Sequence, residues 1–174
     1  MSRRVNIEEF ESFTYITFYT IRYDDIDDSL TDTFFLQYKD DERYAEYVFE
    51  LSNIIENIGN HGDIDGGKIF RSENKARALP PKREAKTGYL HLRSEPPLRL
   101  FCYCVSDEII ILFGGGVKSA MPVQDCPTLR MPFQEAQKLS QAIADAIKDG
   151  SITHTGKILY PPPGSMEKDI FFFI

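Results

Sequence analysis

The sequence predicts an α+β fold: a mostly antiparallel sheet with a central β-hairpin and helices packed on one side of it. Two apolar runs, Leu98–Val105 and Glu108–Phe113, are separated by only two polar residues, which is typical of a hairpin. Residues 40–58 and 132–149 repeat apolar side chains at helical spacing. The sequence has neither a Gly-x-Gly-x-x-Gly motif nor a run of alternating strands and helices, which disfavours a dinucleotide-binding fold.

The first third of the chain predicts a strand, a connector and a helix. Residues 13–23 are almost all β-branched or aromatic, which predicts a strand, and the acidic stretch 24–32 predicts a polar connector. Residues 40–58 predict a helix that ends at Gly59 or Gly62. Its apolar face consists of Tyr44, Tyr47, Val48, Leu51, Ile54, Ile55 and Ile58. Four glycines in residues 59–68 predict a loop.

The remaining elements surround the hairpin. Residues 88–93 predict a short strand before it, and the glycine run 114–116 predicts a break or a bulge in its second strand. The helix over 132–149 ends at Gly150. Residues 151–160 and 170–174 predict two short strands around a Pro-Gly turn. The apolar end, Phe-Phe-Phe-Ile, must pack into the fold or contact a partner, because an exposed run of this kind invites aggregation.

Length and charge limit the function classes. The 174 residues suit a single domain. The net charge of −7 argues against loose binding to nucleic acid, yet it is unevenly spread. Residues 1–65 hold 5 basic and 16 acidic side chains, net −11, whereas residues 66–118 hold 10 basic and 5 acidic, net +5. The central block therefore permits a local basic site.

The cysteines and the apolar runs indicate the compartment. Cys102, Cys104 and Cys126 are odd in number and lack the spacing of a zinc site, so we expect reduced thiols in the core and no metal. No apolar run is long enough to span a bilayer, and no signal-peptide pattern follows the first residues. We expect a cytoplasmic protein.

Two groups of residues could carry chemistry. Arg99, Phe101, Tyr103 and Val105 share one face of the first hairpin strand, where a cation beside two rings suits a phosphate with a stacked base. The alternative is that Phe101 and Tyr103 pack under a helix, with Arg99 at the rim. His91 and Arg93 share a face of the short strand and suit phosphate chemistry, or else belong to an exposed edge strand.

Residues 98–120 resemble a specific family. The hairpin has the form Leu-Arg-apolar-aromatic, a polar turn, an apolar strand and a glycine segment ending in Lys118. It resembles the hairpin of toxins of the RelE/HigB superfamily, and most closely their longer, Bacteroidetes-type subgroup. The accompanying motifs of that subgroup match residues 70–75 (Phe-Arg-Ser-Glu-Asn-Lys), 78–80 (Ala-Leu-Pro), 124–127 (Gln-Asp-Cys-Pro), 150–153 and 156–157. The resemblance runs from about residue 40 onward.

The resemblance implies a RelE-like core over about 40–148, with an N-terminal strand extension over 1–39 and a C-terminal β extension over 150–174. It implies the toxin of a type II toxin–antitoxin pair, an mRNA interferase in which the RNA 2′-OH attacks the adjacent phosphorus without a metal or cofactor. The expected partners are mRNA, free or on the ribosome, and a small helical antitoxin of the helix-turn-helix type.

The motif positions imply particular roles. Arg99 and Lys118 would contact phosphate first, then Arg71 and Lys75, with Tyr103 stacking on a base or helping a proton move. Arg77 and Phe101 would bind RNA. His91 and Arg93 are further candidates for binding RNA, because they share one face of the predicted short strand and not because they match a motif. This hypothesis requires that the basic side chains converge on one concave face. Those residues are Arg71, Lys75, Arg77, Arg93, Arg99 and Lys118.

Two other functions stay open. A non-catalytic protein-interaction module on the same fold is favoured by the acidic N-terminal third and the apolar end. A different small enzyme is the third hypothesis, with no residue pattern that favours a particular reaction.

Overall fold

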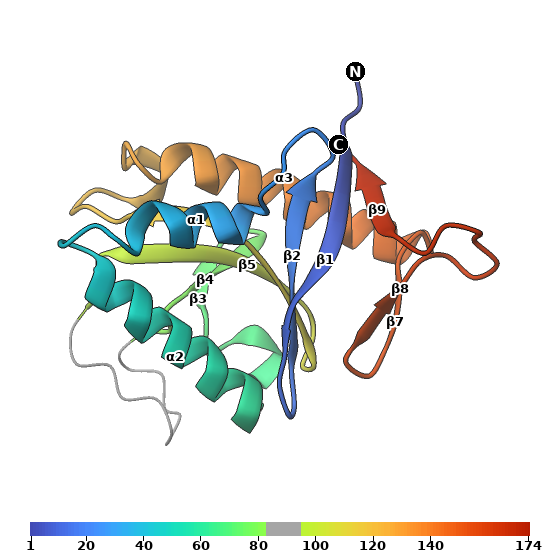
Figure 1. Cartoon of the computed structure of the whole chain (residues 1–174), viewed down its shortest axis with the longest axis horizontal. Helices are drawn as coiled ribbons and strands as arrows, with labels where there is room; N and C mark the ends of the chain where they lie inside the picture. Colours follow the sequence, from blue (N-terminus) through green and yellow to red (C-terminus); the bar gives the residue numbers. More distant parts are fainter. Residues whose placement is uncertain (83–94) are drawn as a thin grey trace.

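The structure is a computed structural model, and it describes residues 1–82 and 95–174. A seven-stranded sheet forms the centre of this part of the chain (Figure 1). Its strands are β1 (Arg4–Ser12), β2 (Thr17–Tyr23), β3 (Arg71–Glu73), β4 (Ala76–Leu79), β5 (Leu98–Ser106), β6 (Ile109–Val117) and β9 (Ile170–Phe173). Their order is β3-β4-β5-β6-β2-β1-β9. Only β2 and β6 pair in parallel; the other neighbours are antiparallel, so the predicted fold class is confirmed.

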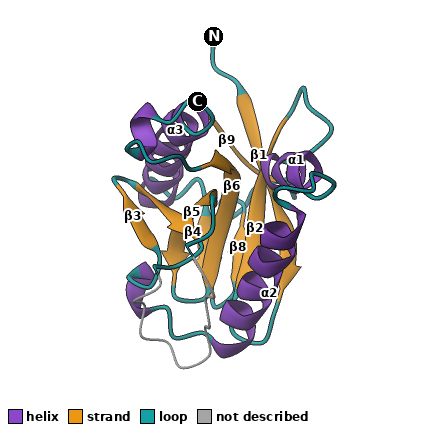
Figure 2. Cartoon of the chain, turned by 90° about the vertical axis from the view of Figure 1, so that its left-hand side faces the viewer, coloured by secondary structure: helices purple, strands orange, loops and turns teal. Residues whose placement is uncertain are grey.

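Helices cover both faces of this sheet, not one as the sequence suggested. α1 (Leu30–Tyr38) and α2 (Ala45–His61) pack on one face, and α3 (Arg130–Lys148) packs on the other (Figure 2). The reason is visible in β6, where Ile109, Ile111 and Phe113 enter the α3 core while Ile110 and Leu112 enter the α1–α2 core. A strand that is apolar at every position must be buried on both faces.

The N-terminal region differs most from the expectation. Residues 13–16 lie between β1 and β2, and the strand predicted over 13–23 begins only at Thr17. β1 was not predicted, and α1 begins within the stretch expected to be a connector. Ser29 caps α1: its hydroxyl accepts a hydrogen bond from the Asp32 amide at 3.0 Å and donates one to the Asp32 carboxylate at 2.8 Å.

The two long helices are confirmed with shifted starts, and they end as predicted: Gly62, one of the two glycines proposed, caps α2, and α3 ends just before Gly150. α2 begins at Ala45 and continues past the glycine at position 59 to His61, before the short 3-10 turn Asp65–Gly67 (η1). Its predicted apolar side chains all contribute to the core with α1. α3 begins two residues earlier than predicted, after the 3-10 turn Val123–Asp125 (η2).

The central hairpin forms as predicted, from β5 and β6. The glycine run stays within β6, and the pairing shifts between Leu100, which faces Gly115, and Cys102, which faces Leu112. The bulge is therefore confirmed and the break is not. Position 115 requires glycine because the backbone of Arg99 comes close to it: a Cβ there would lie 1.8 Å from the carbonyl oxygen of Arg99.

The C-terminal segment forms two separate structures instead of one pair of strands. β7 (Thr153–Thr155) and β8 (Ile158–Tyr160) make a small hairpin of their own. β9 pairs with β1 at the edge of the main sheet, so residues near both termini lie side by side (Figure 1). Phe172 is buried, as the apolar end required, whereas Phe173 is 57% exposed.

The cysteines are free, with Cys102 and Cys126 buried and Cys104 half-buried, as expected. Among the described residues, no helix combines the length and apolar character needed to cross a membrane.

Candidate functional site

The side chains of β5 alternate between the two faces of the sheet, as expected for a strand. Leu98, Leu100 and Cys102 enter the α1–α2 core, while Phe101 and Tyr103 pack toward α3. Phe101 has no exposed surface, and its ring lies 6.1 Å from that of Phe133 on α3. Phe101 is therefore a core residue and cannot stack on a base, because α3 covers it. The alternative of packing under a helix is correct for this residue.

Arg99 alternates onto the same face of β5 as Phe101 and is buried. Its side chain is 5% exposed, and Nη1 donates to the carbonyl oxygens of Pro96 at 2.6 Å and Leu98 at 2.9 Å. Nη2 donates to Glu95 Oε1 at 3.0 Å. Burial lowers the pKa of Arg99, and the charge of Arg71 lowers it further, whereas Glu95 and Glu73 oppose the shift. The guanidinium still stays protonated at neutral pH.

Arg71, on β3, meets Arg99 at the same carboxylate. Its Nη2 donates to Glu95 Oε1 at 2.6 Å, and its Nε donates to the carbonyl oxygen of Pro80 at 2.9 Å. The Arg71 side chain is 12% exposed, whereas that of Glu95 is 57% exposed. Two nearly buried cations thus share one carboxylate that faces solvent. One carboxylate neutralises only part of the positive charge of the two guanidiniums, so an anion from solution could compete with Glu95.

Glu73 lies two residues along β3 and faces the same cations. Burial raises the pKa of its carboxyl, although the positive charges of Arg99, Arg71 and Lys118 act against the shift. A carboxyl with a raised pKa beside several cations is typical of functional sites. Glu73 stands within the motif at residues 70–75 and was not predicted as a site residue. Glu73 is two residues from Arg71, so both side chains lie on the same face of β3. This spacing is the signal that could have identified it.

Lys118 follows β6 at the same end of the hairpin. Arg99 pairs with Gly116, and the Lys118 amide donates to the carbonyl oxygen of Pro97, so Lys118 lies two residues beyond the partner of Arg99. Its Nζ donates to the carbonyl oxygens of Ser119 and Met121, and the residue as a whole is half-buried. We call Arg71, Glu73, Glu95, Arg99 and Lys118 the arginine cluster.

Other predicted site residues lie elsewhere. Arg77 pairs with Cys102, so it points to the α1–α2 face, opposite Arg99. Lys75 lies in the turn between β3 and β4, where its side chain contacts Gln141 on α3. Tyr103 is half-buried and lies four residues along β5 from Arg99, about 13 Å between Cα atoms at strand spacing. Burial raises the pKa of its hydroxyl.

The required convergence is therefore only partly met. Arg71, Arg99 and Lys118 come together, whereas Arg77 and Lys75 do not join them. His91 and Arg93, and the strand predicted over 88–93, lie outside the described residues. The reason for the split is register: the pairing of Arg77 with Cys102 places it on the wrong face.

The chemistry available to the arginine cluster is binding and polarising an anion. It combines two guanidiniums, one ammonium and a carboxyl with a raised pKa, which suits a phosphate group and one proton transfer. Among residues 1–82 and 95–174, no group of three or more His, Cys, Asp or Glu side chains is placed to hold a metal ion.

Comparisons with known proteins identified no relative. No protein-family model, curated protein or solved structure matches this chain.

Proposed function

We propose that the chain is a RelE/HigB-like endoribonuclease toxin that cleaves mRNA at the arginine cluster and is held inactive by a small helical antitoxin. The observation that supports it is the placement of Glu73, a carboxyl with a raised pKa, among Arg71, Arg99 and Lys118. Two of these cations lie at motif positions of the hairpin that carries the resemblance. The protein would act in the cytoplasm, on mRNA that is free or on the ribosome.

The proposed step is an internal transfer at phosphorus. The 2′-oxygen of a ribose bonds to the adjacent phosphorus while the bond from phosphorus to the 5′-oxygen breaks. The Glu73 carboxylate accepts the 2′-hydroxyl proton, and the Lys118 ammonium donates a proton to the leaving 5′-oxygen. The products are a 2′,3′-cyclic phosphate and a 5′-hydroxyl end. Arg71 and Arg99 stabilise the charge that develops on the phosphoryl oxygens, replacing Glu95 as their anionic partner.

A cleavage assay with the purified full chain tests this proposal. The substrates are a single-stranded RNA oligonucleotide and an mRNA on translating ribosomes, and the products are analysed for cyclic phosphate and 5′-hydroxyl ends. We expect cleavage by the wild type and a loss of about 100-fold or more in Glu73→Gln, with RNA binding retained. Arg77→Ala, which removes a basic residue from the opposite face, is the matched control and should cleave normally.

Expression in a bacterial host extends the test to the toxin role. Growth arrest with new mRNA 5′ ends is expected from the wild type, and neither from Glu73→Gln. Absence of cleavage with both substrates, from folded wild-type protein, would overturn the proposal. So would equal loss in Glu73→Gln and Arg77→Ala.

The second candidate is a non-catalytic protein-interaction module. The observation that favours it is the set of hydrogen bonds from the Arg99 guanidinium to two carbonyl oxygens and Glu95, which ties together the residues that precede and begin β5. Under this hypothesis the arginine cluster fixes the end of the sheet, and Arg99→Ala lowers the melting temperature while no RNA is cut by either protein.

A further inference from the structure

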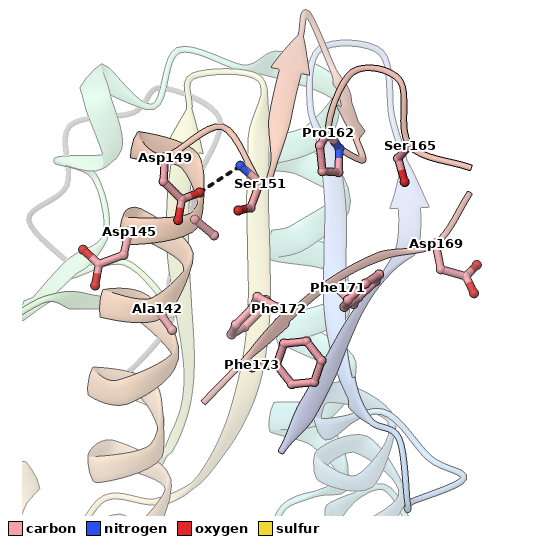
Figure 3. A pocket seen from close by; sticks show the side chains of 11 residues that line it. Ala142, Asp145, Asp149, Ser151, Pro162, Ser165, Asp169, Phe171, Phe172 and Phe173 are labelled. Carbon is pink, nitrogen blue, oxygen red and sulfur yellow. Dashed lines mark hydrogen bonds between the residues drawn. The ribbon is translucent and has the colours of Figure 1, made fainter. Parts of the chain in front are cut away.

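A groove of about 430 Å³ lies between the second half of α3, the edge strand β9 and the loop that follows β8 (Figure 3). Carboxylates come from the helix and the loop, and rings come from the strand. The residues that define its character are Asp145, Asp149, Asp169, Phe171, Phe172 and Phe173. The groove therefore combines negative charge with an aromatic wall.

The strand that forms this wall has a free edge. Within residues 1–82 and 95–174, β9 is the last strand of the sheet and β1 is its one neighbour. The main chain of Ile174 exchanges hydrogen bonds with Arg3, at 2.8 and 3.1 Å. Because bonded and non-bonded pairs alternate in an antiparallel ladder, the amide and carbonyl groups of Phe171 and Phe173 point away from β1. No loop or helix of the described residues bonds to these groups.

Few contacts with cations of the described residues offset the carboxylates of the groove. Asp149 accepts a hydrogen bond from the Ser151 amide at 2.9 Å, and the side chain and amide of Ser151 together lower the pKa of its carboxyl. Asp145 accepts one from the Gln141 side-chain amide at 2.9 Å, and neither aspartate forms an ion pair with a described residue. Asp169 lies 4.0 Å from Arg4 and is 81% exposed. The groove is therefore complementary to a positively charged ligand.

The rings already bind a cation of this chain. The Arg4 guanidinium lies 3.9 Å from the centre of the Phe171 ring. Phe173 is 57% exposed and lies edge-on to Phe171 at 5.8 Å. A second guanidinium or ammonium beside these rings would gain the same cation–π attraction together with the charge of Asp169, which lies 4.0 Å from Arg4.

We propose that this groove binds an extended, basic peptide segment of a partner protein, which adds to β9 as a further strand. Main-chain groups of the peptide would bond to Phe171 and Phe173, and alternate arginine or lysine side chains would reach the aspartates of the groove. An open strand edge supplies affinity, and the side-chain contacts beside it supply specificity. This inference goes beyond the proposed function, because none of its residues belongs to the arginine cluster.

Fluorescence anisotropy with the full chain tests the proposal. The probe is a labelled short peptide in which arginine and valine alternate. We expect saturable binding, weakened about tenfold in the variant Asp145→Asn/Asp149→Asn/Asp169→Asn. The control variant Asp27→Asn/Asp28→Asn/Asp40→Asn removes the same charge from other exposed positions and should bind within about twofold of the wild type.

A backbone-modified peptide separates strand addition from charge attraction. The same peptide with N-methyl groups at alternate amides cannot complete a ladder and should bind much more weakly. Amide hydrogen exchange at Phe171 and Phe173 should slow in the complex. Equal binding of the N-methylated peptide, or equal weakening in both aspartate variants, would overturn the proposal. Concentration-dependent dimerisation of the chain that protects the same amides would also overturn it, in favour of a second copy.

Discussion

Arg71 and Arg99 donate hydrogen bonds to the same atom, Oε1 of Glu95, over 2.6 and 3.0 Å. The carboxylate is therefore the shared counter-charge of two nearly buried cations from strands that are not neighbours. Removing its charge breaks the ion pairs of both cations with Glu95, while their hydrogen bonds to carbonyl oxygens remain.

Glu95→Gln is expected to lower the stability by about 1–2 kcal/mol and to increase the affinity for inorganic phosphate. The measurement is the melting temperature as phosphate is added, and the rise should be larger in the variant than in the wild type. Glu108→Gln removes the same charge at the opposite end of the hairpin and should respond like the wild type. A variant with no greater response to phosphate would show that the two arginines are unavailable to anions.

Glu73 makes stability depend on pH in a defined direction. Burial raises its pKa in the folded protein above the ordinary value of 4.5. As the pH rises, the unfolded chain loses the proton first, so the carboxylate destabilises the folded state once the pH exceeds the folded pKa. Glu73→Gln should therefore raise the melting temperature by about 1–3 °C at pH 7 and leave it unchanged at pH 4. The same difference at both pH values would contradict this explanation.

Phe101 tests the distinction between a core residue and a base-stacking residue. Phe101→Ala should destabilise the protein by about 3–5 kcal/mol in urea unfolding, because it removes a fully buried ring. Phe49→Ala, at a ring that is 69% exposed, should change stability by less than about 0.5 kcal/mol. Phe101→Leu preserves most of the volume and should keep any RNA affinity. Loss of RNA binding in a stable Phe101→Leu protein would contradict the core assignment.

The glycine run offers a paired comparison within one strand. A Cβ at Gly115 would lie 1.8 Å from the Arg99 carbonyl oxygen, whereas at Gly114 the nearest atom is 3.9 Å away. Gly115→Ala should destabilise the protein by about 3 kcal/mol or more and displace Arg99, while Gly114→Ala should cost about 1 kcal/mol at most. Urea unfolding of both variants checks this, and equal effects would show that the bulge adapts.

Local patterns predicted the elements whose partners lie nearby. The apolar spacing of α2 and α3 and the two-residue turn between β5 and β6 need no distant information. α1 was missed because its acidic approach resembles a connector, although Ser29 followed three residues later by Asp32 is a readable helix start. β1 was missed although Val5 and Ile7 alternate with polar residues, as in a strand with one buried face.

The site could be predicted only in part, because sequence spacing carries no register. Arg71, Arg77 and Arg99 appear equivalent in a basic stretch. Strand pairing places Arg77 opposite Cys102 and therefore on the other face from Arg99. The roles of Glu73 and Glu95 depend on the same pairing. Each is close in sequence to one arginine, Glu73 to Arg71 and Glu95 to Arg99, but strand pairing brings the other arginine to it.

The pairing of β1 with β9 also affects how the chain is made. Arg4 lies opposite Phe173, so β1 is translated long before its outer neighbour exists. At synthesis rates of about 5–20 residues per second, the gap is on the order of 10–30 s. During that interval the nascent chain displays an unpaired β1 edge, and a chaperone or a neighbouring nascent chain can occupy it before β9 arrives.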